Sequence, residues 1–86
     1  MPLYLIERDF AQQLELSEQD ALDIQSVNAS EGVKWLYSFL SANKRKTYCL
    51  YQAADPELIQ RAADKAGVPA NRIVRVDQFT PPELTQ

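Results

Sequence analysis

The sequence predicts a single α+β domain whose strands and helices follow the order βαββαβ. Three observations support this prediction. Two segments begin with helix-capping residues and end at a glycine. Four other segments are rich in β-branched and aromatic residues, as strands are. The chain has only 86 residues, 45% of them hydrophobic and 24% charged, which suits one small domain without a second core.

The first half of the chain predicts a strand, a helix and a second strand. Residues 3–10 begin apolar and then alternate, which is typical of a strand. Ser17 is placed to cap a helix, and Gly32 to end it in the left-handed conformation. The inward side of this helix is predicted from positions at helical spacing: Ala21, Ile24 and Val27. Residues 33–42 give the strongest strand pattern of the chain.

The second half predicts a strand, a helix and a strand in turn. Residues 43–46 are a polar, basic turn, and 47–54 form the second arm of a hairpin. Asp55 as N-cap and Pro56 at the first helical position open a helix that Gly67 closes. Residues 72–79 are the last strand. We therefore expect one domain over residues 1–79 and a C-terminal tail over 80–86.

This element order is that of the ferredoxin-like fold, a split β-α-β arrangement. Right-handed crossovers then predict a four-stranded antiparallel sheet of order 4-1-3-2 with two helices on one face. The other face of the sheet is left uncovered by this chain. Its side chains are therefore expected to decide the biology.

Alternation along the strands assigns side chains to the two faces of the predicted sheet. The helix-facing set is Tyr4, Ile6, Leu36, Leu40, Tyr48, Leu50, Val74 and Val76. The open-face set is Leu3, Leu5, Glu7, Trp35, Tyr37, Phe39, Cys49, Tyr51, Ile73, Arg75 and Asp77. The open-face set is too apolar to be left in water, since a large exposed apolar patch usually marks an interface. We therefore expect a homodimer, with two sheets packed face to face in a barrel-like assembly.

Composition argues against several classes of function. A formal net charge of -3 disfavours nucleic acid and anionic membranes as partners, and the basic turn at residues 44–46 is too small to reverse this. The single cysteine, and an N-terminus without a leader pattern, predict a cytoplasmic location. No apolar run is long enough to span a bilayer. The chain has no histidine, so Ser-His and Cys-His catalysis are excluded, and a binding function is favoured over an enzymatic one.

Three kinds of residue on the predicted open face are candidates for a ligand site, each with a structural alternative. Glu7 either forms an ion pair with Arg75 or contacts a ligand or metal. Cys49 is either a small buried hydrophobe or a thiolate ligand. The aromatic side chains either form interface core or line a pocket with indole and phenol donors: Trp35, Tyr37 and Tyr51.

The order of these motifs resembles the DUF4242 family, small bacterial ferredoxin-like proteins that include nickel-binding members. The resemblance rests on Ile6-Glu7-Arg8, on Trp35 followed by Ser38-Phe39, on Tyr48-Cys49 with Tyr51, and on Gly67-Val68-Pro69-Ala70. It spans residues 2–79.

The resemblance implies a dimer and a divalent metal such as nickel, with Glu7 and Cys49 as the matching metal-ligand positions. At the two places where family members carry histidine, this chain has Tyr37 and Ala62. The other groups able to contact an ion are Asp9, Asp77 and the Tyr37 phenol. Because imidazole is a preferred nickel ligand, we predict that this chain does not bind nickel tightly.

Three functions remain open from the sequence. The first is a sensor-like homodimer that binds a small molecule or an ion at the open sheet face. The second is an enzyme of the dimeric α+β-barrel kind acting on a small molecule. The third is a protein-interaction module without ligand, which a Glu7–Arg75 pair in a filled core would favour.

Overall fold

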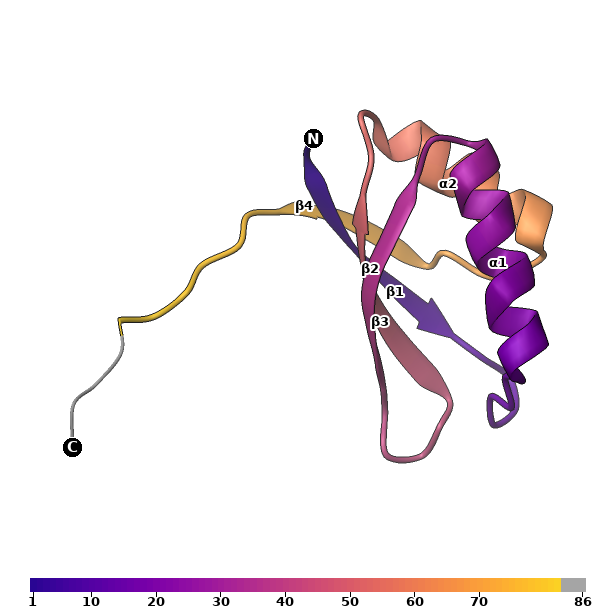
Figure 1. Cartoon of the computed structure of the whole chain (residues 1–86). Helices are drawn as coiled ribbons and strands as arrows, with labels where there is room; N and C mark the ends of the chain where they lie inside the picture. Colours follow the sequence, from indigo (N-terminus) through magenta and orange to yellow (C-terminus); the bar gives the residue numbers. More distant parts are fainter. Residues whose placement is uncertain (83–86) are drawn as a thin grey trace.

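The computed structural model describes residues 1–82, which form a four-stranded antiparallel sheet with both helices on one face (Figure 1). The elements are β1 (Leu3–Asp9), α1 (Glu18–Ser30), β2 (Lys34–Leu40), β3 (Lys46–Gln52), α2 (Pro56–Ala66) and β4 (Arg72–Val76). The strands lie in the order β2-β3-β1-β4, which is the predicted order 4-1-3-2 read from the other edge. The predicted fold class is confirmed.

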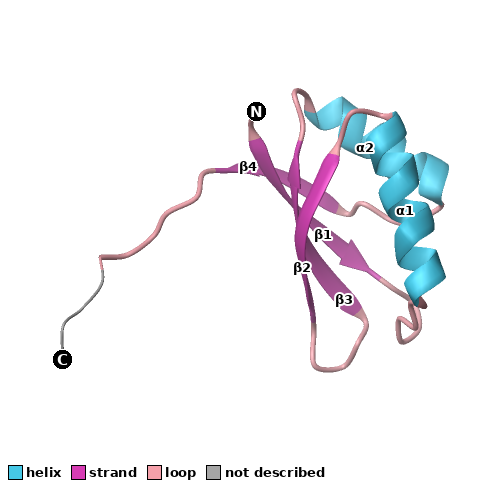
Figure 2. Cartoon of the chain, in the orientation of Figure 1, coloured by secondary structure: helices cyan, strands magenta, loops and turns pink. Residues whose placement is uncertain are grey.

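The strands are shorter than the sequence predicts at their C-terminal ends. Strand β2 ends at Leu40, β3 at Gln52 and β4 at Val76. Residues 77–82 follow β4 as an exposed segment without regular secondary structure, which leads away from the sheet (Figure 2). Most of the predicted tail, residues 83–86, lies outside the described residues.

Both helices begin and end where their capping residues predict. The Ser17 hydroxyl accepts a hydrogen bond from the Asp20 amide at 3.1 Å, and the Asp20 carboxylate accepts one from the Ser17 amide at 3.2 Å. This reciprocal pair satisfies two backbone donors at the start of α1. At the start of α2, the Asp55 carboxylate accepts a hydrogen bond from the Glu57 amide. Gly67 ends α2 at φ 70°, a conformation that glycine adopts without steric cost.

The core lies between α2 and the two central strands, β1 and β3. Tyr4 pairs with Tyr51 across these strands, and Ile6 pairs with Cys49. All four side chains are buried on the helix side of the sheet, where Ile59 of α2 packs against them. Ala62 and Ala63 complete the buried side of α2.

Helix α1 covers the sheet less closely. It packs against α2 and the edge strand β2, and it reaches the central strand β3 through the hydrogen bond from Asn28 to Tyr51. Its predicted inward residues do point inward, but all of them remain half-buried: Ala21, Ile24 and Val27. Space is therefore left between α1 and the centre of the sheet.

The predicted assignment of side chains to faces is correct for β1 and wrong for β3 and β4. Cys49 and Tyr51 face the helices, because they lie opposite Ile6 and Tyr4. The same pairing places Ile73 and Arg75 on the helix side. The open face carries residues predicted to lie under the helices: Tyr48, Leu50, Val74 and Val76. The middle of strand β3, residues 48–51, is apolar or aromatic at every position, so its alternation there contains no contrast by which the faces could be told apart.

A β-bulge divides strand β2 between the two faces. Trp35 pairs with Tyr51 and Tyr37 with Leu50, so Leu36 has no partner of its own in the ladder. The extra residue places Trp35 on the helix side and Tyr37 on the open face. Phe39 follows the open-face register, and on this edge strand it also borders the space on the helix side. The prediction that all three aromatic side chains share one face is therefore wrong.

Neither helix in the described part of the chain is long and apolar enough to cross a membrane.

The two helices are joined to each other at one end by Glu31, which follows α1. Its carboxylate forms ion pairs with Lys65 and, at 3.7 Å, with Arg61, both on α2.

This junction predicts a pH dependence of stability. The hydrogen bond and charge of Lys65, with the charge of Arg61, lower the pKa of Glu31 below its ordinary value of 4.5, against a smaller opposing effect of burial. A lowered folded-state pKa contributes stability that is present above the unfolded value and lost as pH falls through the folded value. Between pH 7 and pH 3, the free energy of unfolding measured with urea is therefore expected to fall less in Glu31→Gln than in the parent. Glu15→Gln, in an exposed loop, should follow the parent curve; identical acid limbs for all three proteins would contradict this role.

Candidate functional site

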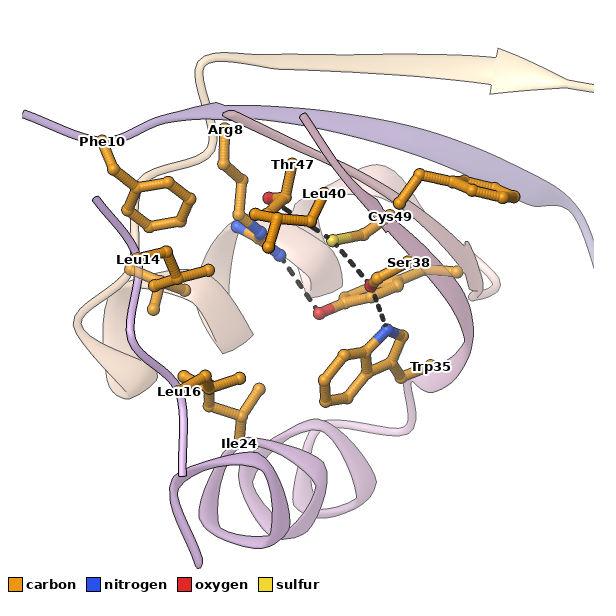
Figure 3. A pocket seen from close by; sticks show the side chains of 13 residues that line it. Arg8, Phe10, Leu14, Leu16, Ile24, Trp35, Ser38, Leu40, Thr47 and Cys49 are labelled. Carbon is orange, nitrogen blue, oxygen red and sulfur yellow. Dashed lines mark hydrogen bonds between the residues drawn. The ribbon is translucent and has the colours of Figure 1, made fainter. Parts of the chain in front are cut away.

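A cavity of about 220 Å³ fills the space between α1 and the helix side of the sheet. The connection from β1 to α1 forms one of its walls (Figure 3). Most of its lining is apolar. The lining residues are Arg8, Phe10, Leu14, Leu16, Ile24, Trp35, Ser38, Phe39, Leu40, Thr47, Cys49, Tyr51 and Val68.

Polar groups on β2 and β3 form a chain of hydrogen bonds along the cavity. The Trp35 indole N–H donates to the Ser38 hydroxyl at 2.6 Å, and Ser38 donates to the Cys49 sulfur at 3.0 Å. The Cys49 thiol is 3.7 Å from the Thr47 hydroxyl, to which it donates (Figure 3). Because each group in this chain has its partner, these side chains can face an apolar space without an unsatisfied polar atom.

Arg8 is the one charged residue among the described residues that line the cavity. It is only 4% exposed, and no described carboxylate forms an ion pair with it. Its guanidinium instead donates hydrogen bonds to the Pro69 carbonyl and, at 3.1 Å, to the Tyr51 hydroxyl. It also lies 5.6 Å from the centre of the Tyr51 ring. These neutral partners hold the charge in place without neutralising it.

Tyr51 connects the sheet, α1 and Arg8. Its hydroxyl accepts a second hydrogen bond, at 3.4 Å, from the side-chain amide of Asn28. Asn28 is the one buried residue of α1. The Tyr51 ring packs against the Trp35 indole, with 6.4 Å between ring centres. The hydrogen bond between Asn28 and Tyr51 is therefore one of the contacts that hold α1 over the cavity.

The β2–β3 hairpin holds the wall formed by residues 10–16. The Leu14 amide donates to the Lys44 carbonyl at 2.6 Å, and the Phe10 amide donates to the Arg45 carbonyl at 2.8 Å. The Arg45 guanidinium donates to the Ala11 carbonyl at 2.9 Å. The basic turn is thus part of the scaffold of the cavity.

The structure separates the six site residues predicted from the sequence into three groups. Trp35, Cys49 and Tyr51 come together in the cavity. Glu7 and Tyr37 lie on the opposite, open face of the sheet. Arg75 is exposed on β4 and lines no part of the cavity.

The predicted alternative in which Glu7 forms an ion pair with Arg75 is wrong. Its carboxylate lies 3.4 Å from the Lys46 ammonium on the neighbouring strand β3, and Asp9 lies 3.7 Å from the same group. Arg75 projects from the other face of the sheet. Glu7 and Asp9 raise the pKa of Lys46, chiefly through the hydrogen bond between Lys46 and Glu7.

Sequence reasoning missed three polar residues of the site: Arg8, Asn28 and Ser38. For Arg8 a signal was present, because alternation in β1 places it on the same face as Tyr4 and Ile6, both correctly predicted to be buried. For Ser38 the same kind of signal was present, because it alternates with Leu36 and Leu40, both predicted to face the helices. Asn28 carries no such signal, since it lies beside the inward positions of α1.

The open face of the sheet presents an apolar row between two more polar rows. The rows run from β2 to β4 and follow the strand pairing. The middle row is Tyr37, Leu50, Leu5 and Val74. The flanking rows are Lys34, Gln52, Leu3 and Val76, and Phe39, Tyr48, Glu7 and Arg72. Tyr37 and Phe39 are 66% and 64% exposed, which is unusual for such large apolar side chains.

Comparison with known proteins supports the expected resemblance. Residues 4–76 match the model of a family described as nickel responsive protein SCO4226-like. The crystal structure of SCO4226 from Streptomyces coelicolor A3(2) superposes with a TM-score of 0.77 at 19% sequence identity, covering 91% of this chain and 99% of that one. No curated protein matches the chain. At this identity the structural likeness establishes the fold.

The residues of this chain do not fit a nickel ion. The chain has no histidine, and residues 1–82 contain no group of three or more Cys, Asp or Glu side chains arranged to hold a metal. Glu7 and Cys49 project from opposite faces of the sheet, so one ion cannot contact both within a protomer. The carboxylates of Glu7 and Asp9 are already bonded to Lys46.

We therefore predict that nickel does not bind this chain with a dissociation constant below about 1 µM at neutral pH, since such affinity generally needs several imidazole or thiolate ligands. Calorimetric titration of nickel into the purified protein measures this. Glu7→Gln and Cys49→Ser serve as the matched variants. Submicromolar binding that is lost in either variant would overturn the prediction and would place a nickel ligand at that residue.

Proposed function

We propose, from the premise that this chain belongs to the SCO4226-like family of nickel-responsive proteins, that it is a sensor-like homodimer that binds a small apolar molecule rather than nickel. The ligand site is the cavity between α1 and the sheet. The dimer interface is the open face of the same sheet. The observation that supports this proposal most directly is the cavity itself, which a domain of this size leaves unfilled.

The lining of the cavity favours an apolar occupant. The cavity of about 220 Å³ is partly open to solvent, and its lining is almost entirely apolar. The hydrophobic effect therefore favours an occupant that removes this surface from water. Leu14, Leu16 and Ile24 lie across the cavity from Trp35 (Figure 3). Tyr51 also lines it. A single ring or short chain would contact both sides.

The groups in the cavity favour binding over catalysis. Cys49 is the obvious nucleophile, but its sulfur is bonded to the hydroxyls of Ser38 and Thr47. A catalytic thiol needs a neighbouring base. No carboxylate, lysine or histidine that could act as that base lies among the described lining residues.

The open face favours a second copy of the chain as its cover. Its apolar middle row crosses all four strands, and its outer rows supply both signs of charge, from Lys34 and Arg72 to Glu7. A two-fold axis would place one middle row against the other, which is how self-complementary patches associate. Each large aromatic side chain covered in this way withdraws roughly 150–250 Å² from water.

Binding in the cavity is directly observable because Trp35, the one tryptophan of the chain, forms part of its wall. We expect hexan-1-ol to shift the Trp35 emission and to raise the thermal unfolding temperature. Ile24→Phe should weaken the apparent affinity for hexan-1-ol at least tenfold in both measurements, because the larger ring projects from α1 into the cavity. Leu22→Phe, on the 50% exposed side of the same helix, is the matched control. Equal responses in the two variants would place the ligand elsewhere, and no response in the parent would reject a ligand-binding cavity.

Dimerisation is tested separately from ligand binding. Sedimentation at micromolar concentration is expected to give a particle of twice the 9.8 kDa chain mass. Tyr37→Lys should weaken association about 30-fold or more, roughly 2 kcal/mol, because it buries an uncompensated charge in the middle row. Leu22→Lys places the same side chain on the outer side of α1 and should leave the dimer intact. A parent protein that stays at 9.8 kDa would refute the interface.

A further inference from the structure

The uncompensated charge of Arg8 carries information about the ligand that the size of the cavity does not. A guanidinium stays protonated under all physiological conditions, so a buried arginine is a buried positive charge. Buried charges in proteins are normally paired with an opposite charge, because desolvating an ion costs several kcal/mol that neutral partners do not fully offset. Arg8 is 4% exposed and has a carbonyl and a phenol as its described hydrogen-bond partners.

The carboxylates nearest to Arg8 in sequence are occupied on the other side of the sheet. Glu7 and Asp9 flank it in β1, and both form ion pairs with Lys46 on the open face. Glu31, the carboxylate that joins the helices, is bonded to Lys65 and Arg61. Among the described residues, none of the acidic side chains forms an ion pair with the guanidinium.

The guanidinium lies where a cavity ligand would meet it. Its two terminal nitrogens each make one described hydrogen bond, whereas a guanidinium carries five N–H donors. Arg8 lies between the apolar wall, at Phe10 and Leu14, and the Tyr51 hydroxyl (Figure 3). Donors that remain on its edge can reach a ligand atom in the cavity without disturbing the bonds that hold the side chain.

We propose that the ligand is an apolar monocarboxylate, with its carboxylate on Arg8 and its hydrocarbon part between α1 and Trp35. This inference rests on the proposed function and names the chemical class of its ligand. A carboxylate accepts charge-assisted, bidentate hydrogen bonds from a guanidinium, roughly twice as strong as neutral ones. Its single negative charge balances the single positive charge of the site.

The charge of the site disfavours phosphate monoesters and amines as ligands, and the volume of the cavity favours a short hydrocarbon part. A phosphate monoester carries a charge near -2 at neutral pH, so one arginine would leave it with an excess negative charge in an apolar space. An amine would meet a like charge. A cavity of about 220 Å³ holds one aromatic ring or a chain of roughly six carbons.

The decisive experiment compares three probes that share one hydrocarbon chain: hexanoate, hexan-1-ol and hexylamine. Each is titrated into the purified full chain at pH 7.5, with the Trp35 emission as the readout. We expect hexanoate to bind at least tenfold more tightly than hexan-1-ol, and hexylamine to bind more weakly than either. Tighter or equal binding of hexan-1-ol would overturn the carboxylate assignment while leaving the apolar ligand cavity intact. Absence of binding by all three probes would reject the cavity as a ligand site, and the proposed function with it.

A second measurement assigns the preference to Arg8. Arg8→Met keeps an apolar chain of similar length and removes the charge, so hexanoate should lose its tenfold advantage while hexan-1-ol binding is retained. Arg61→Met, on the exposed side of α2, is the matched control and should keep the preference. A preference that survives Arg8→Met would overturn the assignment.

If Arg8→Met does not fold, the side-chain nitrogen resonances of Arg8 in the parent protein give the same answer. Hexanoate should shift them and hexan-1-ol should not. Unchanged Arg8 resonances at saturating hexanoate would place the carboxylate away from this residue and overturn the proposal.

Discussion

The β-bulge between Trp35 and Tyr37 is the constraint on which both surfaces of this protein depend. Without the extra residue, period-two alternation would place Trp35, Tyr37 and Phe39 on one face of the sheet. With it, the indole turns toward the helices, where it joins the Tyr51 ring and donates a hydrogen bond to Ser38. The phenol and phenyl groups stay on the open face. One inserted residue thus supplies aromatic surface both to the cavity and to the apolar row.

Much of the fold follows from local chemistry that a sequence displays openly. The capping residues and closing glycines place both helices correctly, and strand propensity identifies all four strands, because these signals depend on neighbours in the chain. The face that β3 presents does not follow from its own residues, since Cys49 and Leu50 are similarly apolar and only the pairing with Ile6 and Leu5 distinguishes them. The sequence predicts one open-face group that contains Trp35, Cys49 and Tyr51 together with Glu7, Tyr37 and Arg75. The first three lie on the helix side instead, because pairing and the bulge decide the face, and Arg8 lies with them.

The family supplies the frame, and the side chains inside it set the chemistry. The likeness to SCO4226 extends over 91% of this chain at only 19% identity, so the two share a backbone arrangement far more than a set of residues. In this chain the positions compared with family histidines are Tyr37, on the open face, and Ala62, buried in α2. Neither faces the cavity beside Arg8, where an arginine in an apolar space offers a different kind of selectivity from metal coordination.

The two-sided character of strand β3 limits the ways in which this protein can change over evolutionary time. Thr47, Cys49 and Tyr51 serve the helix side, whereas Tyr48, Leu50 and Gln52 serve the open face. A point substitution alters one side and spares the other, so the two surfaces can drift independently. A single-residue insertion or deletion within the strand exchanges the two sets at once. Divergence in this strand is therefore expected to proceed by replacement of residues, with changes in length confined to the hairpin turn and the connecting loops.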